Sequence, residues 1–354
     1  MFVDEQGATN HGIWVEVLGR FGYHRVMLEK PLKYAIIGCG LIGKKRLQAL
    51  PSGSVSVLCD IDEARARDLA GLSHGGRVVG NSLEAVNDSN VDIVIIATLN
   101  KDLAPLAKQA LEAKKHVLIE KPGAISSSEL EELLKLSRVV NRQVRIGYNH
   151  RYHPAFLKAH EIVAAGSIGP IMFIRARYGH GGRLGYNKEW RADKKLSGGG
   201  ELMDQGVHLI DLAGSFLGKF DKIDGHVATS FWDMAVDDNA FMSLRTPKNQ
   251  TAWLQVSCTE WKNLFSFEIY GRDAKLHIEG LGGSYGIERL YYYRMLPEMG
   301  PPETTIWEFP RGDESWKKEM EVFEQDIRAG REPNCGLQSG IETLKAVEKI
   351  YARS

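Results

Sequence analysis

Residues 33–60 read KYAIIGCGLIGKKRLQALPSGSVSVLCD and decide the fold of the first half of the chain. An apolar run opens the stretch, Gly38, Gly40 and Gly43 follow with the spacing G-x-G-x-x-G, and a second apolar run ends at Asp60. Alone, such a glycine motif is a weak signal. Between a buried strand and a helix it is typical of a turn that binds the phosphates of a dinucleotide.

The three glycines have separate predicted roles. Gly38 permits a tight turn, Gly40 lets a pyrophosphate approach the backbone, and Gly43 allows the next helix to pack closely on the strand. Leu41 and Ile42 open that helix, and its N-terminus attracts an anion. These five residues form the first candidate cofactor-binding site.

Asp60 follows Gly43 by 17 residues, at the end of the second apolar run. A carboxylate there accepts hydrogen bonds from the adenosine ribose hydroxyls and repels a 2′-phosphate, so we expect NAD rather than NADP. A helix N-cap is a second role open to Asp60. Arg65 and Arg67 lie on the following helix. A phosphate group bound by these arginines therefore stays open as an alternative.

The stretch 33–150 alternates strands with helices, which is typical of a Rossmann domain with a doubly wound parallel sheet. The expected strands are 33–38, 54–60, 92–98, 116–120 and 144–148, and the expected helices are 41–50, 62–72, 82–87, 103–114 and 126–141. The strands are continuous runs rich in Val and Ile, as in strands buried on both faces. Ser126 and Glu129 predict a capping box.

The stretch 151–354 predicts an α+β domain with a large, mostly antiparallel open sheet, because several strand-like segments follow one another. Helices are expected at 154–165, 201–217, 313–329 and 338–352, and strands at 170–178, 222–232, 237–246, 250–258, 264–270 and 274–279. We expect the last helix to pack back on the first domain.

Residues 1–32 stand apart as an N-terminal extension. Two interpretations are open. In one, Met27 is the natural start and the residues before it are an upstream extension. In the other, the segment is an ordered arm of the first domain.

Composition argues against several classes of protein. With 45 basic and 45 acidic residues, the 354-residue chain has a formal net charge of zero, which argues against a nucleic-acid binder. The four cysteines are too scattered for a zinc motif or a disulfide framework. No apolar stretch approaches the roughly 18 residues that span a bilayer, and the N-terminus has no signal-peptide pattern. We therefore expect a cytoplasmic protein without a membrane partner.

The tripeptide Glu120-Lys121-Pro122 ends the expected strand at 116–120. Ligands of open α/β sheets bind beyond the carboxyl ends of the strands. A lysine at that edge can hydrogen-bond a hydroxyl or a developing oxyanion. Lys121 is thus a candidate catalytic residue.

Asp204 and His208 follow a glycine run at 198–200. On a helix they are four residues apart and share a face, so we expect them to touch and to act as a proton-transfer pair. Asp211 lies one turn further and leaves a zinc site as a weaker interpretation. No companion ligand cluster is evident, and we expect no metal.

In this order the three motifs resemble those of the Gfo/Idh/MocA oxidoreductases, a family named for glucose–fructose oxidoreductase, inositol dehydrogenase and a rhizopine-catabolism protein. The resemblance covers about residues 33–354. It implies hydride transfer between NAD(P) and a carbon of a sugar or polyol. It also implies that Lys121, Asp204 and His208 are the catalytic set, with His208 as the general base.

The resemblance also implies contacts with the cofactor. The residues concerned are Thr98, Asn100, Glu120 and Lys121. It further implies a cis bond between Lys121 and Pro122. Many relatives read A-T-P-N-x-x-H where this chain has Leu99 and Leu103 in place of Pro and His. That departure bears on cofactor affinity and on the shape of the loop.

The junction between the two domains supplies the substrate candidates Tyr148, Asn149 and Arg151, whereas His150 and His153 are interpreted as linker residues. The stretch 175–195 is rich in basic residues and includes Arg177 and Arg183. Because arginine captures carboxylates and phosphates well, an acidic substrate is expected, such as a nucleotide sugar, sugar phosphate or uronate. A solvated loop or a subunit contact is the alternative.

Three functions are consistent with these motifs. The first is an NAD-dependent sugar or polyol dehydrogenase. The second is a glycosidase of the same family that uses tightly held NAD, and the third is a non-catalytic dinucleotide sensor. The resemblance implies a homodimer or homotetramer, because the open sheet commonly makes subunit contacts in relatives.

Overall fold

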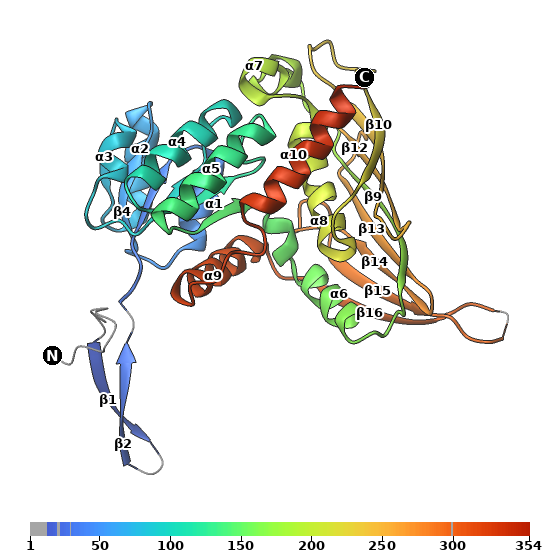
Figure 1. Ribbon diagram of the computed structural model, residues 1–354, viewed down its shortest axis with the longest axis horizontal. Coiled ribbons are helices and arrows are strands. Elements are labelled where there is room, and N and C mark those ends of the chain that lie inside the picture. The colour runs from blue at the N-terminus through green and yellow to red at the C-terminus, as the bar shows by residue number, and fades with distance from the viewer. Residues whose placement is uncertain (1–12, 20–21, 29, 299) are drawn as a thin grey trace.

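The computed structural model describes residues 13–19, 22–28, 30–298 and 300–354, and two sheets form its body (Figure 1). A six-stranded parallel sheet belongs to the first half, and an eight-stranded, mostly antiparallel sheet belongs to the second. The predicted fold class, a Rossmann domain followed by an α+β domain with a large open sheet, is confirmed. No helix within the described ranges is long and apolar enough to cross a membrane.

The parallel sheet has the strand order β5-β4-β3-β6-β7-β8. Its strands are β3 (Tyr34–Ile37), β4 (Val55–Cys59), β5 (Arg77–Val79), β6 (Ile93–Ile96), β7 (His116–Glu120) and β8 (Val144–Gly147). Its helices are α1 (Leu41–Ala49), α2 (Glu63–Ser73), α3 (Ser82–Val86), α4 (Asn100–Glu112) and α5 (Ser127–Val140). The predicted capping box of Ser126 and Glu129 is present at α5. The sequence does not predict β5, because that strand has three residues and only Val79 is buried.

Side chains of the parallel strands alternate between two apolar cores. Ala35 and Ile37 face a core that includes residues of α4 and α5. Tyr34 and Ile36 face a second core that includes residues of α1, α2 and the later helix α9 (Ser315–Arg328). Successive side chains of a strand point to opposite faces, so a strand with helices on both sides must be apolar throughout.

The second sheet has the strand order β10-β11-β12-β9-β13-β14-β15-β16, and only the β12–β9 pair is parallel. Its strands are β9 (Ile171–Gly179), β10 (Lys222–Ala228), β11 (Asn239–Arg245), β12 (Thr251–Ser257), β13 (Leu264–Gly271), β14 (Ala274–Glu279), β15 (Glu288–Arg294) and β16 (Glu303–Phe309). The last two strands are not predicted by the sequence. β16 is mostly exposed at the sheet edge and therefore has no alternation of apolar residues.

One face of this sheet carries helices, as Figure 1 shows. They are α6 (Pro154–Ala164), α8 (Val207–Leu217) and α10 (Leu337–Tyr351). The predicted helix 201–217 is two elements, because a π-helical turn, η4 (Leu202–Gly206), precedes α8. The other short segments are η1 (Asn149–Tyr152), η2 (Tyr186–Lys188), η3 (Trp190–Ala192) and α7 (Lys194–Ser197).

Helix α10 contacts both halves of the molecule. The Glu348 carboxylate accepts hydrogen bonds from the amide and hydroxyl of Ser127 on α5, at 2.6 and 2.7 Å. On the same side, a Cβ atom on Gly340 would lie 2.8 Å from a methyl of Leu130. The helix also packs against α8 and β10. The C-terminal segment therefore fixes the large sheet against the Rossmann domain.

At the other end of the chain, β1 (Ile13–Gly19) and β2 (Gly22–Leu28) pair as an antiparallel hairpin (Figure 1). Of the predicted extension at 1–32, residues 1–12, 20–21 and 29 lie outside the described residues.

Candidate active site

The glycine loop between β3 and α1 is shaped by close backbone contacts. A Cβ atom on Gly38 would lie 2.3 Å from the Ala97 carbonyl oxygen, and one on Gly43 would lie 2.0 Å from the Gly38 carbonyl oxygen. A Cβ on Gly40 would meet no described atom within 4 Å. The backbone is thus open at the one glycine predicted to admit a pyrophosphate. Within the described chain no side chain caps the first turn of α1, so its amides are available to the anion.

Asp60 is largely buried and follows β4 directly. Its Oδ2 accepts a hydrogen bond from the Cys39 amide at 2.7 Å, and its Oδ1 accepts one from the Asp62 amide at 2.9 Å. The N-cap of α2 is Asp62, whose side chain accepts from the Ala64 amide, so the N-cap interpretation of Asp60 is wrong. Asp60 instead ties the second strand to the glycine loop.

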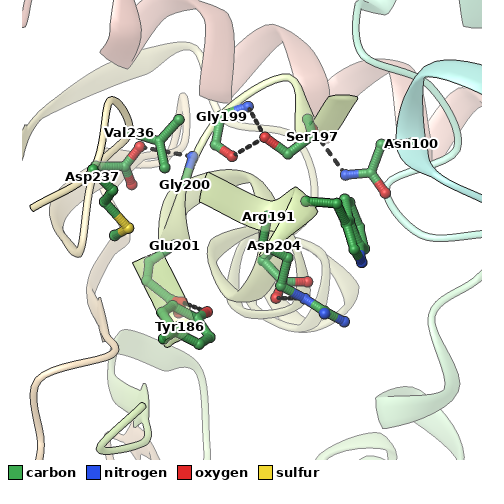
Figure 2. Close-up of a pocket in the computed structure, with 12 residues that line it drawn as sticks. Asn100, Tyr186, Arg191, Ser197, Gly199, Gly200, Glu201, Asp204, Val236 and Asp237 are labelled. Atoms are coloured by element: carbon green, nitrogen blue, oxygen red, sulfur yellow. Dashed lines mark hydrogen bonds and ion pairs between the residues drawn. The ribbon is translucent and has the colours of Figure 1, made fainter. Parts of the chain in front are cut away.

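The loop after β6 reaches across to the second domain. Thr98 and Asn100 both line the large cleft between the domains. The Asn100 side-chain amide donates to the Ser197 carbonyl oxygen at 2.8 Å (Figure 2). This bond connects the start of α4 to the residue before the glycine run at 198–200.

Glu120 is held by a buried arginine. Nε of Arg46 donates to the Glu120 carboxylate at 2.6 Å, and Nη1 of Arg46 donates to Glu319 of α9, also at 2.6 Å. Arg46 is fully buried. The Lys121–Pro122 peptide that follows Glu120 is cis, as the resemblance implies.

The glycine run before Asp204 exists because the backbone passes close to other parts of the chain. A Cβ atom on Gly199 would lie 2.2 Å from the Tyr351 hydroxyl, and one on Gly200 would lie 2.0 Å from the Asp237 carbonyl oxygen. The Gly200 amide donates to the Asp237 carboxylate at 3.0 Å (Figure 2). These contacts fix the start of η4, and with it the position of Asp204.

Asp204 lies between two cations. The Lys121 ammonium bonds Oδ1 of Asp204 and also donates to its backbone carbonyl at 2.8 Å. From the other side, Nε of Arg191 donates to Oδ2 at 3.1 Å (Figure 2). Burial opposes ionisation, but the charges of Lys121 and Arg191 hold the pKa of Asp204 well below its usual value. Asp204 is therefore an anion that orients Lys121.

The predicted contact between Asp204 and His208 is wrong. Within the described residues no hydrogen bond or ion pair joins them, and Asp204 bonds Lys121 and Arg191 instead. Asp204 belongs to the π-helical turn η4. The physical reason is tertiary: Lys121 and Arg191, which the spacing of Asp204 and His208 cannot reveal, engage both oxygens of the Asp204 carboxylate.

His208 is buried among aromatic rings. Its ring lies 3.8 Å from that of His150, 6.1 Å from that of Tyr148 and 6.3 Å from that of Tyr178, measured between centroids. Its Nδ1 is buried and has no partner among the described residues, and the residue lines the cleft. Burial, followed by the charges of Lys121 and His153, lowers the pKa of His208 well below its ordinary value. The ring is therefore neutral at physiological pH.

Of the predicted substrate residues at the domain junction, only Asn149 lines the cleft. Tyr148 is completely buried and packs against His208, so its assignment to substrate binding is wrong. Arg151 is also corrected. Its guanidinium forms two bonds with the Asp211 carboxylate, at 2.6 and 2.7 Å, and lines a different groove, between α8 and α10. Asp211 is thus engaged in an ion pair.

The structure also corrects the predictions for Arg177 and Arg183. Arg177 lies on β9, where Tyr178 faces the cleft and Arg177 must face the opposite side. It is 53% exposed and forms an ion pair with Glu260 at 3.6 Å. Arg183 is 68% exposed and pairs with Glu189 at 2.7 Å. Neither arginine lines the cleft.

The cleft between the domains has a volume of about 360 Å³. Sequence reasoning missed many of the residues that line it. Among the residues missed are Lys45, His150, His153, Tyr178, Trp190, Arg191, Tyr285, Asp313 and Trp316. Three of them carry a signal that could have been used: Tyr178 alternates with outward-facing residues on β9, and His150 and His153 are three residues apart. No group of three acidic, histidine or cysteine side chains within the described ranges could hold a metal ion.

Two family models match this chain. Residues 32–148 match a model described as an oxidoreductase family with an NAD-binding Rossmann fold, and residues 156–277 match the GFO/IDH/MocA C-terminal domain. The D-xylose dehydrogenase of Paenarthrobacter nicotinovorans is 25% identical, over 94% of this chain and 92% of that protein.

Solved structures are similar over nearly the whole chain. An NAD-binding oxidoreductase from Klebsiella pneumoniae has a TM-score of 0.80 at 22% identity and covers 91% of this chain and 96% of its own. A levoglucosan dehydrogenase in complex with NADH has a TM-score of 0.81 at 20% identity and covers 92% of this chain and 98% of its own. At these identities the likeness shows the fold.

Proposed function

This chain belongs to the GFO/IDH/MocA oxidoreductase family and has its NAD-binding Rossmann domain, and on that basis we propose that it is a sugar or polyol dehydrogenase. It would transfer hydride between the nicotinamide and a hydroxyl-bearing carbon. One observation carries the proposal: Thr98 and Ile42, from the glycine-loop edge, line the same cleft as Lys121 and His208. A cofactor on one wall therefore meets a base on the other. Relatives named for D-xylose and inositol support this substrate class.

The bound cofactor supplies the hydride acceptor. The side chains of the protein manage the proton and the charge on the substrate oxygen. His208 is neutral, so its Nε2 can accept the hydroxyl proton. Lys121 donates a hydrogen bond to the same oxygen as it gains negative charge. Asp204 holds Lys121 in place through two contacts.

Asp60 supports NAD as the preferred cofactor over NADP. Its carboxylate already accepts two backbone amides, and it would meet the adenosine ribose at the edge of the sheet. The two nearby arginines do not offer a free phosphate site, because Arg65 pairs with Asp62 at 3.3 Å and Arg67 pairs with Glu63. A 2′-phosphate would therefore face acidic side chains without a cationic partner.

A neutral sugar or polyol fits the cleft better than an acidic one. The cations that line it are Lys45, Lys121 and Arg191, and the carboxylates are Glu120, Asp204 and Asp313. These charges balance, and Arg191 is already engaged by Asp204. Arg177 and Arg183, which motivated the acidic substrate, pair with glutamates outside the cleft.

A substrate panel tests the proposal. Neutral sugars and polyols, sugar phosphates, uronates and nucleotide sugars are each incubated with NAD, and NADH absorbance is followed. We expect net NADH formation with a neutral member. Product release without net NADH would favour the glycosidase with tightly held NAD. NAD binding without turnover of any member would favour the dinucleotide sensor.

We also propose that the uncovered face of the large sheet joins subunits into a homodimer or homotetramer. Four strands of the sheet each have one large apolar side chain exposed on this face. The side chains are Phe173, Phe241, Trp253 and Ile306, exposed by 38, 37, 60 and 54%. A patch of this kind on an open sheet is typical of a subunit interface. Native mass spectrometry measures the assembly, and Trp253→Glu should shift it toward the monomer.

A further inference from the structure

The segment Asn149–Tyr152 places two histidines on one side of the chain. It is the 3₁₀ segment η1, and His153 follows it directly. Side chains three residues apart are eclipsed in a 3₁₀ helix, so His150 and His153 point the same way. Both line the cleft, and their ring centroids are 5.6 Å apart.

His150 connects this pair to His208. The centroids of the two rings are only 3.8 Å apart, with 47° between the planes. Nδ1 of each ring is buried and has no partner among the described residues. A buried polar atom without a partner is destabilising, so two such atoms on neighbouring rings call for an explanation.

His153 lies next to two carboxylates, those of Glu288 and Asp313. Its Nδ1 lies 2.9 Å from a carboxylate oxygen of buried Glu288, and its Nε2 lies 3.9 Å from Oδ1 of Asp313. The Asp313 side chain is 26% exposed. A line of titratable groups therefore runs from His208, at the bottom of the cleft, to a carboxylate in contact with solvent.

We propose that His150 and His153 relay the substrate proton from His208 to Asp313 and solvent. The inference rests on the proposed dehydrogenase function and deepens it. On oxidation the hydroxyl proton passes to His208, which hands a proton to His150. His150 passes it to His153, and Asp313 or water accepts it. Each imidazole returns to its neutral form, and in reduction the proton travels in the opposite direction.

The charged groups around the three histidines favour transfer of the proton over its retention on His150. Lys121 and Lys45 face His150 from the Rossmann domain, and His208 and His153 face it from the second domain. Burial first, and then these groups, lower the pKa of His150 well below its ordinary value. Glu288 and Asp313 face His153 from β15 and from the loop before α9. A proton on His150 is therefore drawn toward the carboxylates.

Neither step between the rings is a direct hydrogen bond among the described residues, because Nδ1 of His208 and Nδ1 of His150 have no partner and the centroids of His150 and His153 are 5.6 Å apart. A water molecule between the rings completes such a step, since bridging water is nearly as effective as a direct hydrogen bond. The relay matters most when sugar and nicotinamide fill the cleft and separate His208 from bulk water.

The test uses two His150 variants and a matched control. His150→Ala removes the relay, and His150→Gln keeps hydrogen bonding without proton transfer. The control is His160→Ala, because His160 is a half-buried histidine of α6 that stacks on Phe216 and bonds Ser215 outside the cleft. We expect kcat of both His150 variants to fall about tenfold, since positioned proton transfer is worth about 10²–10⁴-fold and water replaces it in part.

Two further readouts separate a relay from a structural role. The solvent deuterium isotope effect on kcat should rise in the His150 variants but not in His160→Ala, with KM for the sugar little changed. Added imidazole should restore part of the rate of His150→Ala. The relay is overturned if His150→Gln works at the wild-type rate, if only KM changes, or if His160→Ala behaves like His150→Ala.

A final experiment needs no substrate. A negative result in it therefore counts against the relay and not against the proposed dehydrogenase function. Nitrogen-15 NMR follows the titration of His150 in the wild type and in His208→Gln. Because His208 lowers the pKa of His150, its removal should move that titration to higher pH. An unchanged titration means that the rings are not coupled and overturns the relay. Absence of NADH formation with every sugar overturns the proposed function instead.

Discussion

The wall of the site formed by the glycine loop is shaped by backbone contacts, whereas the opposite wall consists of side chains from widely separated segments. On the first wall, Gly38 and Gly43 bring the chain into contact with itself and Gly40 leaves an opening. On the second, His150, Arg191 and His208 come from three different elements. One wall is suited to holding a cofactor common to many reactions, and the other to selecting and converting one substrate.

This difference predicts that single changes on the two walls have different consequences. Removal of a side chain on the second wall should stop chemistry and spare NAD binding. Changes in the glycine loop should weaken NAD binding or the fold itself.

The largest effect is expected for His208→Ala. A positioned general base typically contributes about 10²–10⁴-fold, so kcat should fall within that range. The affinity for NAD, measured by titration calorimetry, should stay within about twofold of the wild type, because His208 lies on the opposite wall.

The pH profile is the control for that variant. Since the base must be neutral and the pKa of His208 is lowered, the wild-type rate should fall only when the pH drops below the ordinary histidine range near 6.5. His208→Ala should lose this acidic limb. A near-normal kcat with an unchanged profile would make Lys121 the base.

The next largest effect, a loss of stability and of NAD affinity, is expected for Gly43→Ala. The new Cβ would lie 2.0 Å from a backbone oxygen, and overpacking of this kind costs about 1–3 kcal/mol. Thermal unfolding should shift downward, and NAD affinity should fall with it. Gly71→Ala, inside α2, is the matched control, because a Cβ there would meet no described atom within 4 Å. That variant should be neutral or slightly stabilised.

A smaller effect is expected for Asp60→Ala. Loss of a charged hydrogen-bond acceptor is worth about 1.5–3 kcal/mol, and about tenfold weaker NAD binding is the lower end of that range. The preference for NAD over NADP should narrow. Ser126→Ala removes the N-cap of α5 and should lower stability without changing the preference. Equal or tighter NADP binding by the wild type would refute the role of Asp60.

The smallest effect is expected for Arg177→Ala combined with Arg183→Ala. Exposed ion pairs contribute about 0–1 kcal/mol, so KM should stay within about twofold for neutral and acidic sugars alike. Arg191→Ala should be clearly worse, because Arg191 bonds Asp204. A large rise in KM for acidic sugars alone, in the double variant, would restore the acidic-substrate hypothesis.

The same comparison explains what sequence alone could predict. The glycine loop and the parallel strands are local patterns, and the structure has them within a residue or two of the expected bounds. The partners of Asp204 come from tertiary contacts, so the spacing of Asp204 and His208 suggested a contact that Lys121 and Arg191 replace.

The remaining differences depend on tertiary contacts. Arg151 and Arg177 carry the right chemistry for binding anions, but their partners Asp211 and Glu260 are distant in sequence and could not be foreseen. Trp316 reaches the cleft from α9, a helix whose apolar pattern reveals its packing but not its proximity to the site.

Deuterium labelling follows the proposed hydride transfer itself. A neutral sugar deuterated at the carbon to be oxidised is incubated with the enzyme and NAD. The reduced cofactor is then isolated, and its mass is measured by mass spectrometry. The account predicts net NADH that carries one deuterium from the sugar. Reduced cofactor without deuterium, or product formed without net reduction of NAD, would contradict it.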